Sequence, residues 1–168
     1  ERYVLALDMG TSGIRAAVCA LDGSVRAAAM SPLRYRPLRR MGAGARALSL
    51  GRAWDAVGRA SRQALRAAMV SPDRIAAIGV TGQRQGMVAL DADGRDVYAG
   101  PSLDARAIRH DMRMDEALRA RIYRTTGHLP GYLLAPLKLA WMRQHHPRLL
   151  ASVSSVMPLA DWLALMAG

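Results

Sequence analysis

Three short apolar runs separated by turn sequences occupy the start of the chain. The runs are Tyr3–Leu7, Ile14–Leu21 and Ser24–Ala29, and the dipeptide Asp22-Gly23 stands between the last two. An Asp-Gly pair between apolar runs favours a tight hairpin, because it supplies residues with positive φ. The pattern therefore predicts an antiparallel meander of three strands, unlike the strand-helix start of a dinucleotide-binding domain.

A long amphipathic helix is predicted next. Apolar side chains between residues 50 and 69 recur at helical spacing, which places them on one face of a helix. These side chains belong to Trp54, Val57, Ala60, Ala64, Leu65 and Ala68. The helix is expected over Leu50–Met69 and ends before Ser71-Pro72-Asp73, since proline does not continue a helix.

A second group of strands follows this helix. Ile75–Thr81 is short, apolar and β-branched, which is typical of a buried strand, and it runs into the polar segment Gly82–Gly86. Met87–Leu90 and Val97-Tyr98 are predicted strands on either side of the turn Asp93-Gly94. Polar side chains are therefore expected where the first of these strands ends.

The rest of the chain is mainly helical. Helices are predicted over Asp104–Met112, Asp115–Thr125 and Leu134–His145, with Gly127 and Pro147 as stop signals. A strand over Ser154–Met157 and a helix from Pro158 complete the pattern, because proline suits the first turn of a helix.

Composition narrows the class of protein. Of 168 residues, 51% are hydrophobic and 22% charged, so the chain can bury a core, and its length predicts one domain. A single cysteine, Cys19, excludes an internal disulfide framework and a cysteine-based zinc site. No apolar run approaches the roughly 20 residues of a membrane span, and no secretory signal precedes the first strand. We expect a cytoplasmic protein without a membrane partner.

The charge is strongly positive. The chain carries 24 Lys and Arg against 13 Asp and Glu, and the formal charge of +11 first suggests a nucleic-acid partner. All the basic residues except Lys138 are arginines, spread beside abundant alanine, and no aromatic ladder of the kind that binds single strands is interleaved with them. The distribution therefore resembles a compositional habit, and we predict no nucleic-acid partner.

One stretch, Met30–Ala47, concentrates arginines and contains no acids. Its clustered arginines are Arg34, Arg36, Arg39, Arg40 and Arg46. The stretch either attracts an anionic partner or forms a solvated surface loop, and the second interpretation is favoured.

The turn between the first two strands carries candidate phosphate-binding residues. They are Asp8, Gly10, Thr11, Ser12, Gly13 and Arg15. Glycines let phosphate oxygens approach backbone N–H groups, while hydroxyls and a guanidinium add donors and charge. The Asp8 carboxylate suits the Mg²⁺ that accompanies a nucleotide, held through water. An ordinary hairpin carries the same pattern, so the motif alone leaves both interpretations open.

Three motifs in order resemble one family. Asp8–Arg15, followed by Asp22-Gly23, resembles the first phosphate loop of the actin-like superfamily, and in detail that of the FGGY carbohydrate kinases. Ile78–Val88 resembles the segment in which these kinases place sugar-contacting side chains, and Pro101–Arg106 is similar to their Trp-x-Asp-x-Arg segment. Lys138, ahead of a tryptophan, also falls in family order. The resemblance covers essentially the whole chain.

The resemblance implies a fold and an activity. The fold is the α/β, ribonuclease H-like (actin-like ATPase) fold, a mixed sheet that begins with an antiparallel meander and has helices on both faces. The activity is ATP-dependent phosphorylation of a sugar or polyol hydroxyl, with Mg²⁺. Phosphate and metal binding are assigned to Asp8, Gly10, Thr11, Ser12 and Arg15, with Asp8 at the metal. Substrate binding is assigned to Gln83, Arg84, Gln85, Asp104 and Arg106.

Several of these assignments have structural alternatives. Arg84 and Arg106 are also explained as surface arginines, and Asp104 as a helix N-cap. Ser102 stands where many family members have tryptophan, and Gln85 stands where pentulose kinases have histidine and glycerol kinases glutamate. Arg84 resembles the glycerol kinases, whereas Leu103–Ala107 resembles the autoinducer-2 kinase branch. The prediction therefore stops at a sugar or polyol.

The length also matters to the assignment. Family members are much longer, and residues 1–168 match the N-terminal part of their first actin-like domain. In the family, the general base, the second phosphate loop and the adenosine pocket lie downstream, so we assign no catalytic residue and expect no turnover from this chain alone. A non-catalytic module that binds a carbohydrate or a protein is the alternative. An exposed apolar face is expected, and a homo-oligomer formed through it stays open.

Overall fold

The computed structural model describes residues 1–41 and 44–168. Gly42, Ala43 and the side chain of Arg40, all in the arginine-rich stretch, lie outside the described residues. The chain divides into two compact units, whereas its length predicts one domain. Unit 1 contains residues 1–35, 48–84 and 158–168, and unit 2 contains residues 36–47 and 85–157.

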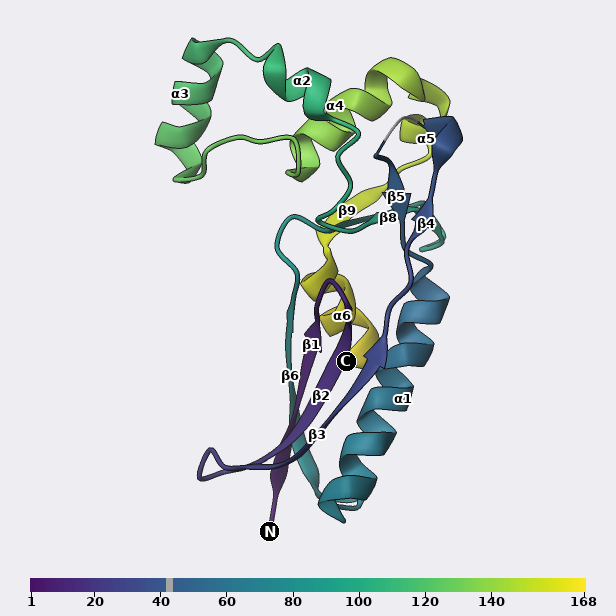
Figure 1. The fold of residues 1–168 in the computed structure, drawn as a ribbon, viewed down its shortest axis with the longest axis vertical. Coiled ribbons are helices and arrows are strands. Elements are labelled where there is room, and N and C mark those ends of the chain that lie inside the picture. The colour runs from purple at the N-terminus through teal and green to yellow at the C-terminus, as the bar shows by residue number, and fades with distance from the viewer. Residues whose placement is uncertain (42–43) are drawn as a thin grey trace. The chain divides into compact units, whose positions relative to one another are not determined.

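Unit 1 is built on a four-stranded mixed sheet. Its strands are β1 (Tyr3–Met9), β2 (Gly13–Ala20), β3 (Val25–Pro32) and β6 (Ile75–Gly82), in the order β3-β2-β1-β6. The pairs β1–β2 and β2–β3 are antiparallel, which confirms the predicted meander, and β6 runs parallel to β1 (Figure 1).

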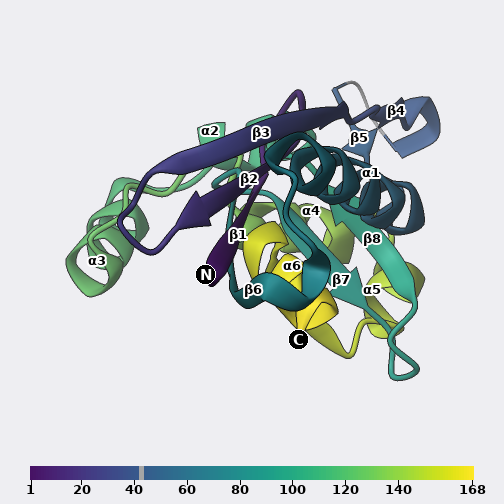
Figure 2. The ribbon, with the colours of Figure 1, turned by 90° about the horizontal axis from the view of Figure 1, so that it is seen from below.

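Two helices pack on one face of this sheet. Helix α1 (Leu50–Ala68) covers β2 and β3, and α6 (Leu159–Ala167) contacts β6 and β1 (Figure 1 and Figure 2). The rings of Trp54 and Trp162 meet edge to face at a centroid distance of 6.4 Å, so both helices lie on the same side. In the described part of unit 1, the prediction of helices on both faces is therefore wrong.

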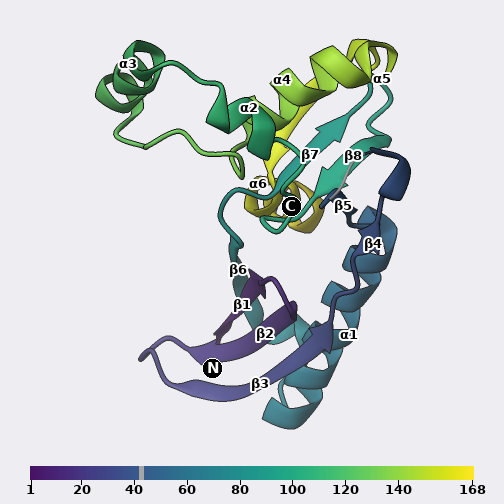
Figure 3. The same ribbon diagram turned by 45° about the horizontal axis from the view of Figure 1, so that its top comes forward.

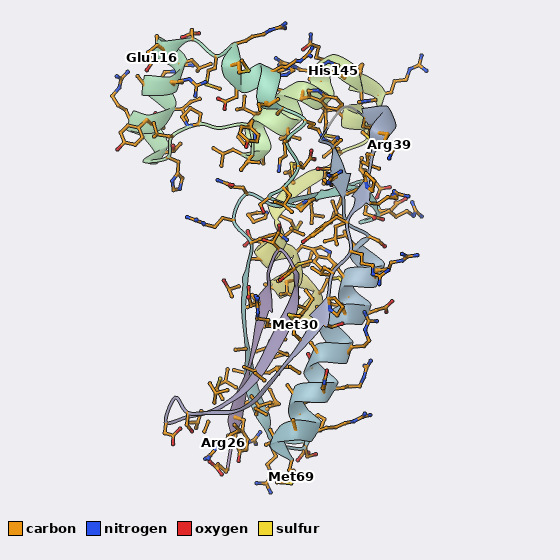
Figure 4. All side chains as sticks on the ribbon, viewed as in Figure 1. Arg26, Met30, Arg39, Met69, Glu116 and His145 are labelled. Carbon is orange, nitrogen blue, oxygen red and sulfur yellow. The ribbon has the colours of Figure 1, made fainter. Side chains whose placement is uncertain are left out.

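Local sequence explains why α1 begins and ends where it does. The hydroxyl of Ser49 accepts a hydrogen bond from the backbone N–H of Arg52 at 3.5 Å, which caps the first turn. Met69, labelled in Figure 4, adopts the left-handed conformation with φ 55° and ends the helix. Small residues fill the buried face of α1 and let it approach the sheet, and they are Ala53, Ala56, Ala60 and Ala64.

Strand β6 differs from its prediction. The sequence favours a buried strand, but β6 is an edge strand and Ile78 is 44% exposed. Its only partner strand among residues 1–41 and 44–168 is β1. The uncovered face of the sheet holds a shallow apolar hollow of about 370 Å³, lined in part by Ala17, Ala28 and Gly79. Self-association through this face stays a prediction.

Unit 2 contains a smaller sheet. Strands β7 (Met87–Leu90) and β8 (Asp96–Gly100) are antiparallel and lie side by side in Figure 3, and β9 (Ser155–Pro158) is on the other side of β7. These strands confirm the predicted ones, with β8 longer than expected because its partner extends the pairing.

The arginine-rich stretch contains short structure that the sequence does not reveal. It forms the 3₁₀ turn η1 (Arg39–Met41) and the antiparallel pair β4 (Arg36–Pro37) and β5 (Arg46–Ala47). Arg39 extends away from the ribbon in Figure 4 and is exposed, like Arg34. Exposure of these arginines agrees with a solvated surface.

Four helices complete the described part of unit 2. They are α2 (Ile108–Met112), α3 (Glu116–Thr126), α4 (Ala135–His145) and α5 (Pro147–Ala151). Helix α5 was not predicted from the sequence, because Pro147 starts a new helix instead of only ending the previous one. The unit 2 core includes Met87, Ala89, Tyr98, Ala107, Leu137, Trp141 and Met142. Within residues 1–41 and 44–168, no helix is both long and apolar enough to cross a bilayer.

Candidate functional site

The hairpin between β1 and β2 presents an exposed ion pair. Asp8 and Arg15 are opposite each other in the β1–β2 register, and Arg15 Nη1 donates to Asp8 Oδ2 at 3.0 Å. The Asp8 side chain is 38% exposed and that of Arg15 is 53% exposed. The N–H of Gly10 donates to the carbonyl of Gly13 at 3.0 Å and closes the turn. The sheet thus holds a carboxylate and a guanidinium at one accessible end.

The two glycines of the hairpin serve different purposes. A Cβ on Gly10 would lie 2.8 Å from Arg15 Nη1, so Gly10 leaves the space that the ion pair occupies. A Cβ on Gly13 would lie 2.7 Å from the backbone oxygen of Ser31. The sequence explained Gly13 by phosphate approach, but the close approach of β3 is already a sufficient reason for glycine.

The tip of the hairpin suits an anion. Thr11 and Ser12 are exposed, and neither hydroxyl makes a hydrogen bond within the described residues. With the guanidinium of Arg15, they form a set of accessible donors that fits phosphate oxygens. No group of three or more His, Cys, Asp or Glu gathers among residues 1–41 and 44–168. A magnesium ion at Asp8 would therefore take its other ligands from phosphate and water, as this ion commonly does.

Gln83 links the end of β6 to this hairpin. Its backbone N–H donates to the carbonyl of Met9 at 2.8 Å, and its side-chain Nε2 lies 3.5 Å from the carbonyl oxygen of Gly10. Nε2 also donates to the hydroxyl of Tyr35 at 3.0 Å. Burial raises the pKa of Tyr35 above its ordinary value. The sequence missed Tyr35, whose only signal was an aromatic residue inside the arginine-rich stretch.

The five predicted substrate residues fall in both units. Gln83 and an exposed Arg84 belong to unit 1, while Gln85, Asp104 and Arg106 belong to unit 2. Gln85 is exposed and adopts φ 68°, an unusual value for a residue other than glycine. The structure brings Gln83 to the β1–β2 hairpin, and it brings Asp104 and Arg106 to each other.

Asp104 and Arg106 form a fully buried ion pair. Arg106 Nε donates to Asp104 Oδ2 at 2.8 Å, and both side chains are 0% exposed. The hydroxyl of Tyr98 also contacts this carboxylate, and burial raises the pKa of Tyr98. The Arg106 guanidinium lies 4.4 Å from the centroid of the Tyr98 ring and 5.1 Å from that of Trp141. Contact with the faces of two aromatic rings stabilises the buried cation.

This geometry corrects two sequence alternatives. Arg106 is not a surface arginine, because its side chain is completely buried. Asp104 does not cap the helix that follows, since the N-cap of α2 is Ala107. The terminal nitrogens Nη1 and Nη2 of Arg106 are buried and have no hydrogen-bond partner among the described residues. They are donors with unused capacity, which is uncommon in a folded interior.

Lys138 on α4 is a further polar residue buried in unit 2. Its Nζ donates to the carbonyl of Gln85 at 3.0 Å and to the carbonyl of Pro101 at 3.2 Å. Burial lowers the pKa of Lys138 to about 8, with Asp104 opposing the shift and Arg106 adding to it. The sequence did not assign a role to Lys138 or Tyr98, because their partners are distant along the chain.

The family description "FGGY family of carbohydrate kinases, N-terminal domain" matches residues 3–167. The chain belongs to this family. Autoinducer-2 kinase from Escherichia coli is 30% identical to this FGGY chain, over 98% of the chain and 31% of the relative. The FGGY chain therefore spans about a third of the length of the curated relatives it matches.

Solved structures support the fold of the FGGY chain. A xylulose kinase from Brucella ovis superimposes with a TM-score of 0.83 at 26% identity, covering 98% of this chain and 33% of that one. A xylulose kinase from Lactobacillus acidophilus gives 0.84 at 16% identity, covering 99% and 33%. The predicted actin-like α/β fold of the FGGY chain is confirmed.

Proposed function

We propose that the complete gene product is an ATP-dependent carbohydrate kinase that phosphorylates a hydroxyl of a sugar or polyol. The observation that carries this proposal is the Gln83 side chain, whose amide reaches the carbonyl of Gly10 in the Asp8–Arg15 hairpin. One residue of the expected sugar segment thereby touches the expected phosphate loop within unit 1. Phosphoryl transfer needs this kind of proximity between the two substrates.

On the phosphate side, the hairpin residues bind and orient the nucleotide. The hydroxyls of Thr11 and Ser12 and the guanidinium of Arg15 donate to phosphate oxygens, near the turn that Gly10 keeps open. Asp8 would hold Mg²⁺ through water, and the Arg15 guanidinium would donate to a phosphate oxygen in place of the Asp8 carboxylate. When bound, ATP would supply the phosphoryl group, and Mg²⁺ would supply the positive charge that neutralises the negative charge of that group during transfer.

On the sugar side, amides and guanidinium groups recognise hydroxyls. Gln83, Arg84 and Gln85 provide donors and acceptors at the strand end, as a polyhydroxyl substrate requires. Asp104 and Arg106 lie below the surface, and the two unpartnered nitrogens of Arg106 are the donors left for a substrate oxygen.

The proposed substrate stays at the level of a class. Relatives and structural neighbours are named kinases of autoinducer-2, xylulose, gluconate and glycerol. The substrates in these names are all small molecules with several hydroxyl groups. Gln85 and Ser102 depart from the family pattern at positions that distinguish one substrate from another. We also propose that the protein acts in the cytoplasm, as the sequence predicts, and that this chain alone does not turn over.

A substrate panel tests the proposal. The complete gene product is incubated with ATP and Mg²⁺, and ADP release is measured with pentuloses, polyols, glycerol and gluconate, with and without a chelator. We expect at least one substrate to be phosphorylated, and the chelator to abolish the reaction. Carbohydrate binding without ADP release from any substrate would instead favour a non-catalytic module.

A further inference from the structure

Lys138 is the one lysine in a chain with 24 basic residues, and it is fully buried. Buried cations require acceptors, and the acceptors here are two backbone carbonyls instead of a carboxylate. Nζ donates to the oxygen of Gln85 at 3.0 Å and to that of Pro101 at 3.2 Å. Lys138 therefore joins two segments that are separated in sequence and lie within unit 2.

Both segments belong to the proposed sugar site. Gln85 lies in the turn that follows β6, and Pro101 begins the segment that contains Asp104 and Arg106. The carbonyl of Pro101 also accepts from the backbone N–H of Asp104 at 3.2 Å. The same carbonyl thus receives a bond from Lys138 and starts the turn that presents the buried ion pair.

The backbone at Gln85 needs external support. Its φ of 68° is one that residues with a Cβ rarely adopt, and such conformations persist only where surrounding contacts hold them. The contact from Lys138 is made to the carbonyl of Gln85 itself, so it orients the peptide at the strained position. The direction of the exposed Gln85 side chain depends on that peptide.

Helix α4 supports the Arg106 side of the site as well. Lys138 and Trp141 are three residues apart on α4 and therefore share a face. The Trp141 ring lies below the guanidinium of Arg106, at 5.1 Å. One helical face thus contacts the Gln85 turn, the Pro101 carbonyl and the Arg106 side chain.

An ammonium group suits this position better than a guanidinium. Its three donors radiate from one atom and reach two carbonyls, whereas the planar fork of arginine is larger and never loses its proton. The charged groups that face Lys138 are Asp104, which favours its protonated form, and Arg106, which opposes it. Burial brings the pKa of Lys138 to about 8, within reach of an enzyme assay.

We propose that Lys138 is a positioning residue that holds the Gln85 turn and the Pro101–Arg106 segment in the geometry that binds the sugar. The proposal rests on the proposed function, since it assigns these segments to the sugar site. It predicts that losing Lys138 weakens sugar binding and leaves nucleotide binding unchanged.

Steady-state kinetics of the complete gene product test the proposal. Lys138→Met is expected to raise the sugar KM about tenfold at pH 7 while the KM for ATP stays within about twofold. The matched control is Arg143→Met, which removes a positive charge from the exposed face of the same helix and is expected to change neither KM. An unchanged sugar KM in Lys138→Met, or an equal rise in both KM values, overturns the proposal.

The pH profile adds a readout that does not depend on the variant folding. In the wild type, the sugar KM is expected to rise as pH increases through about 8, because a neutral amine donates more weakly than an ammonium group. A sugar KM that is flat from pH 7 to pH 9 contradicts the role of Lys138.

Hydrogen exchange separates failure of this proposal from failure of the proposed function. If no substrate is phosphorylated by the wild type, the kinase function fails, but exchange of residues 84–90 and 100–106 still reports positioning. In Lys138→Met, the backbone amide hydrogens are expected to exchange faster in both segments and at an unchanged rate in α3. Identical exchange in the two proteins overturns the positioning role.

Discussion

The two units hold ion pairs of the same chemistry in opposite surroundings. In unit 1, Asp8 and Arg15 pair at 3.0 Å with 38% and 53% of their side chains exposed. In unit 2, Asp104 and Arg106 pair at 2.8 Å with both side chains 0% exposed. Exposed pairs contribute about 0–1 kcal/mol, so a ligand displaces them easily. A buried pair is costly to break, so it acts as a permanent support for its neighbours.

The difference in exposure suits the two ion pairs to different roles, ligand binding for the exposed pair and positioning of neighbouring residues for the buried pair. An exchangeable pair suits a site where a phosphate or a metal ion must replace the existing partner. A buried pair, whose Arg106 guanidinium also lies over the rings of Tyr98 and Trp141, suits a part of the molecule whose geometry must not change during the reaction. Four predictions test this contrast, in order of expected size.

Removing the buried carboxylate should have the largest effect. Asp104→Ala leaves Arg106 buried without its anion, and the free energy of unfolding is expected to fall by about 3–5 kcal/mol. Urea denaturation of the complete gene product measures the change. Asp8→Ala is the control, and its loss is expected to stay below about 1 kcal/mol. Equal losses from the two substitutions would contradict the contrast between the pairs.

Removing the exposed carboxylate should affect catalysis instead of stability. Asp8→Asn keeps the side-chain shape but weakens Mg²⁺ binding, so kcat is expected to fall about 100-fold or more, measured as ADP release. Asp22→Asn changes an exposed acid at the neighbouring β2–β3 turn and should leave kcat unchanged. Near-normal turnover by Asp8→Asn would remove Asp8 from the metal role.

The buried lysine should make stability depend on pH. Burial lowers the pKa of Lys138 to about 8, so the folded chain releases this proton at a lower pH than the unfolded chain does. The cost of burying the charge is complete below pH 8 and declines above it. The free energy of unfolding of wild type relative to Lys138→Met should therefore rise by about 2 kcal/mol between pH 7 and pH 10. A difference that is constant with pH would show that Lys138 keeps its ordinary pKa.

Tyr35 offers the smallest test. Tyr35→Phe removes the hydroxyl that accepts from Gln83 Nε2 at 3.0 Å and frees the amide that reaches the hairpin. Loss of one hydrogen bond should raise the sugar KM about fivefold. Tyr3→Phe removes an exposed hydroxyl that donates to Glu1, far along the chain from Gln83, and should leave the sugar KM unchanged. If both variants match the wild type, Gln83 is not oriented by Tyr35.

Much of the fold could be predicted because it depends on neighbouring residues. The β1–β2–β3 meander follows from alternating apolar runs and an Asp-Gly turn, and α1 follows from helical spacing and a proline stop. The structure confirms both to within a few residues. The candidate phosphate hairpin was found for the same reason, since all its members lie between Asp8 and Arg15.

Predictions failed where the outcome depends on distant residues. Strand β6 has the composition of a buried strand, but its exposure depends on which elements pair with its outer edge. Asp104 has the sequence position of a helix cap, yet its partners are Arg106 and the hydroxyl of Tyr98. The packing of α1 and α6 on the same face of the sheet also could not be inferred from the sequence of either helix alone.

The amino-acid sequence by itself determined the main strands and helices and the resemblance to the FGGY kinases, and it predicted a phosphate-binding role for the hairpin. Only the tertiary structure decided that Asp104 and Arg106 are buried, that Gln83 contacts the hairpin, and that Lys138 ties the Gln85 turn to Pro101. The physical reason is the separation along the sequence of the residues that interact. Turn and helix preferences arise from a few consecutive residues, whereas burial and long-range hydrogen bonds depend on which segments meet in the folded chain.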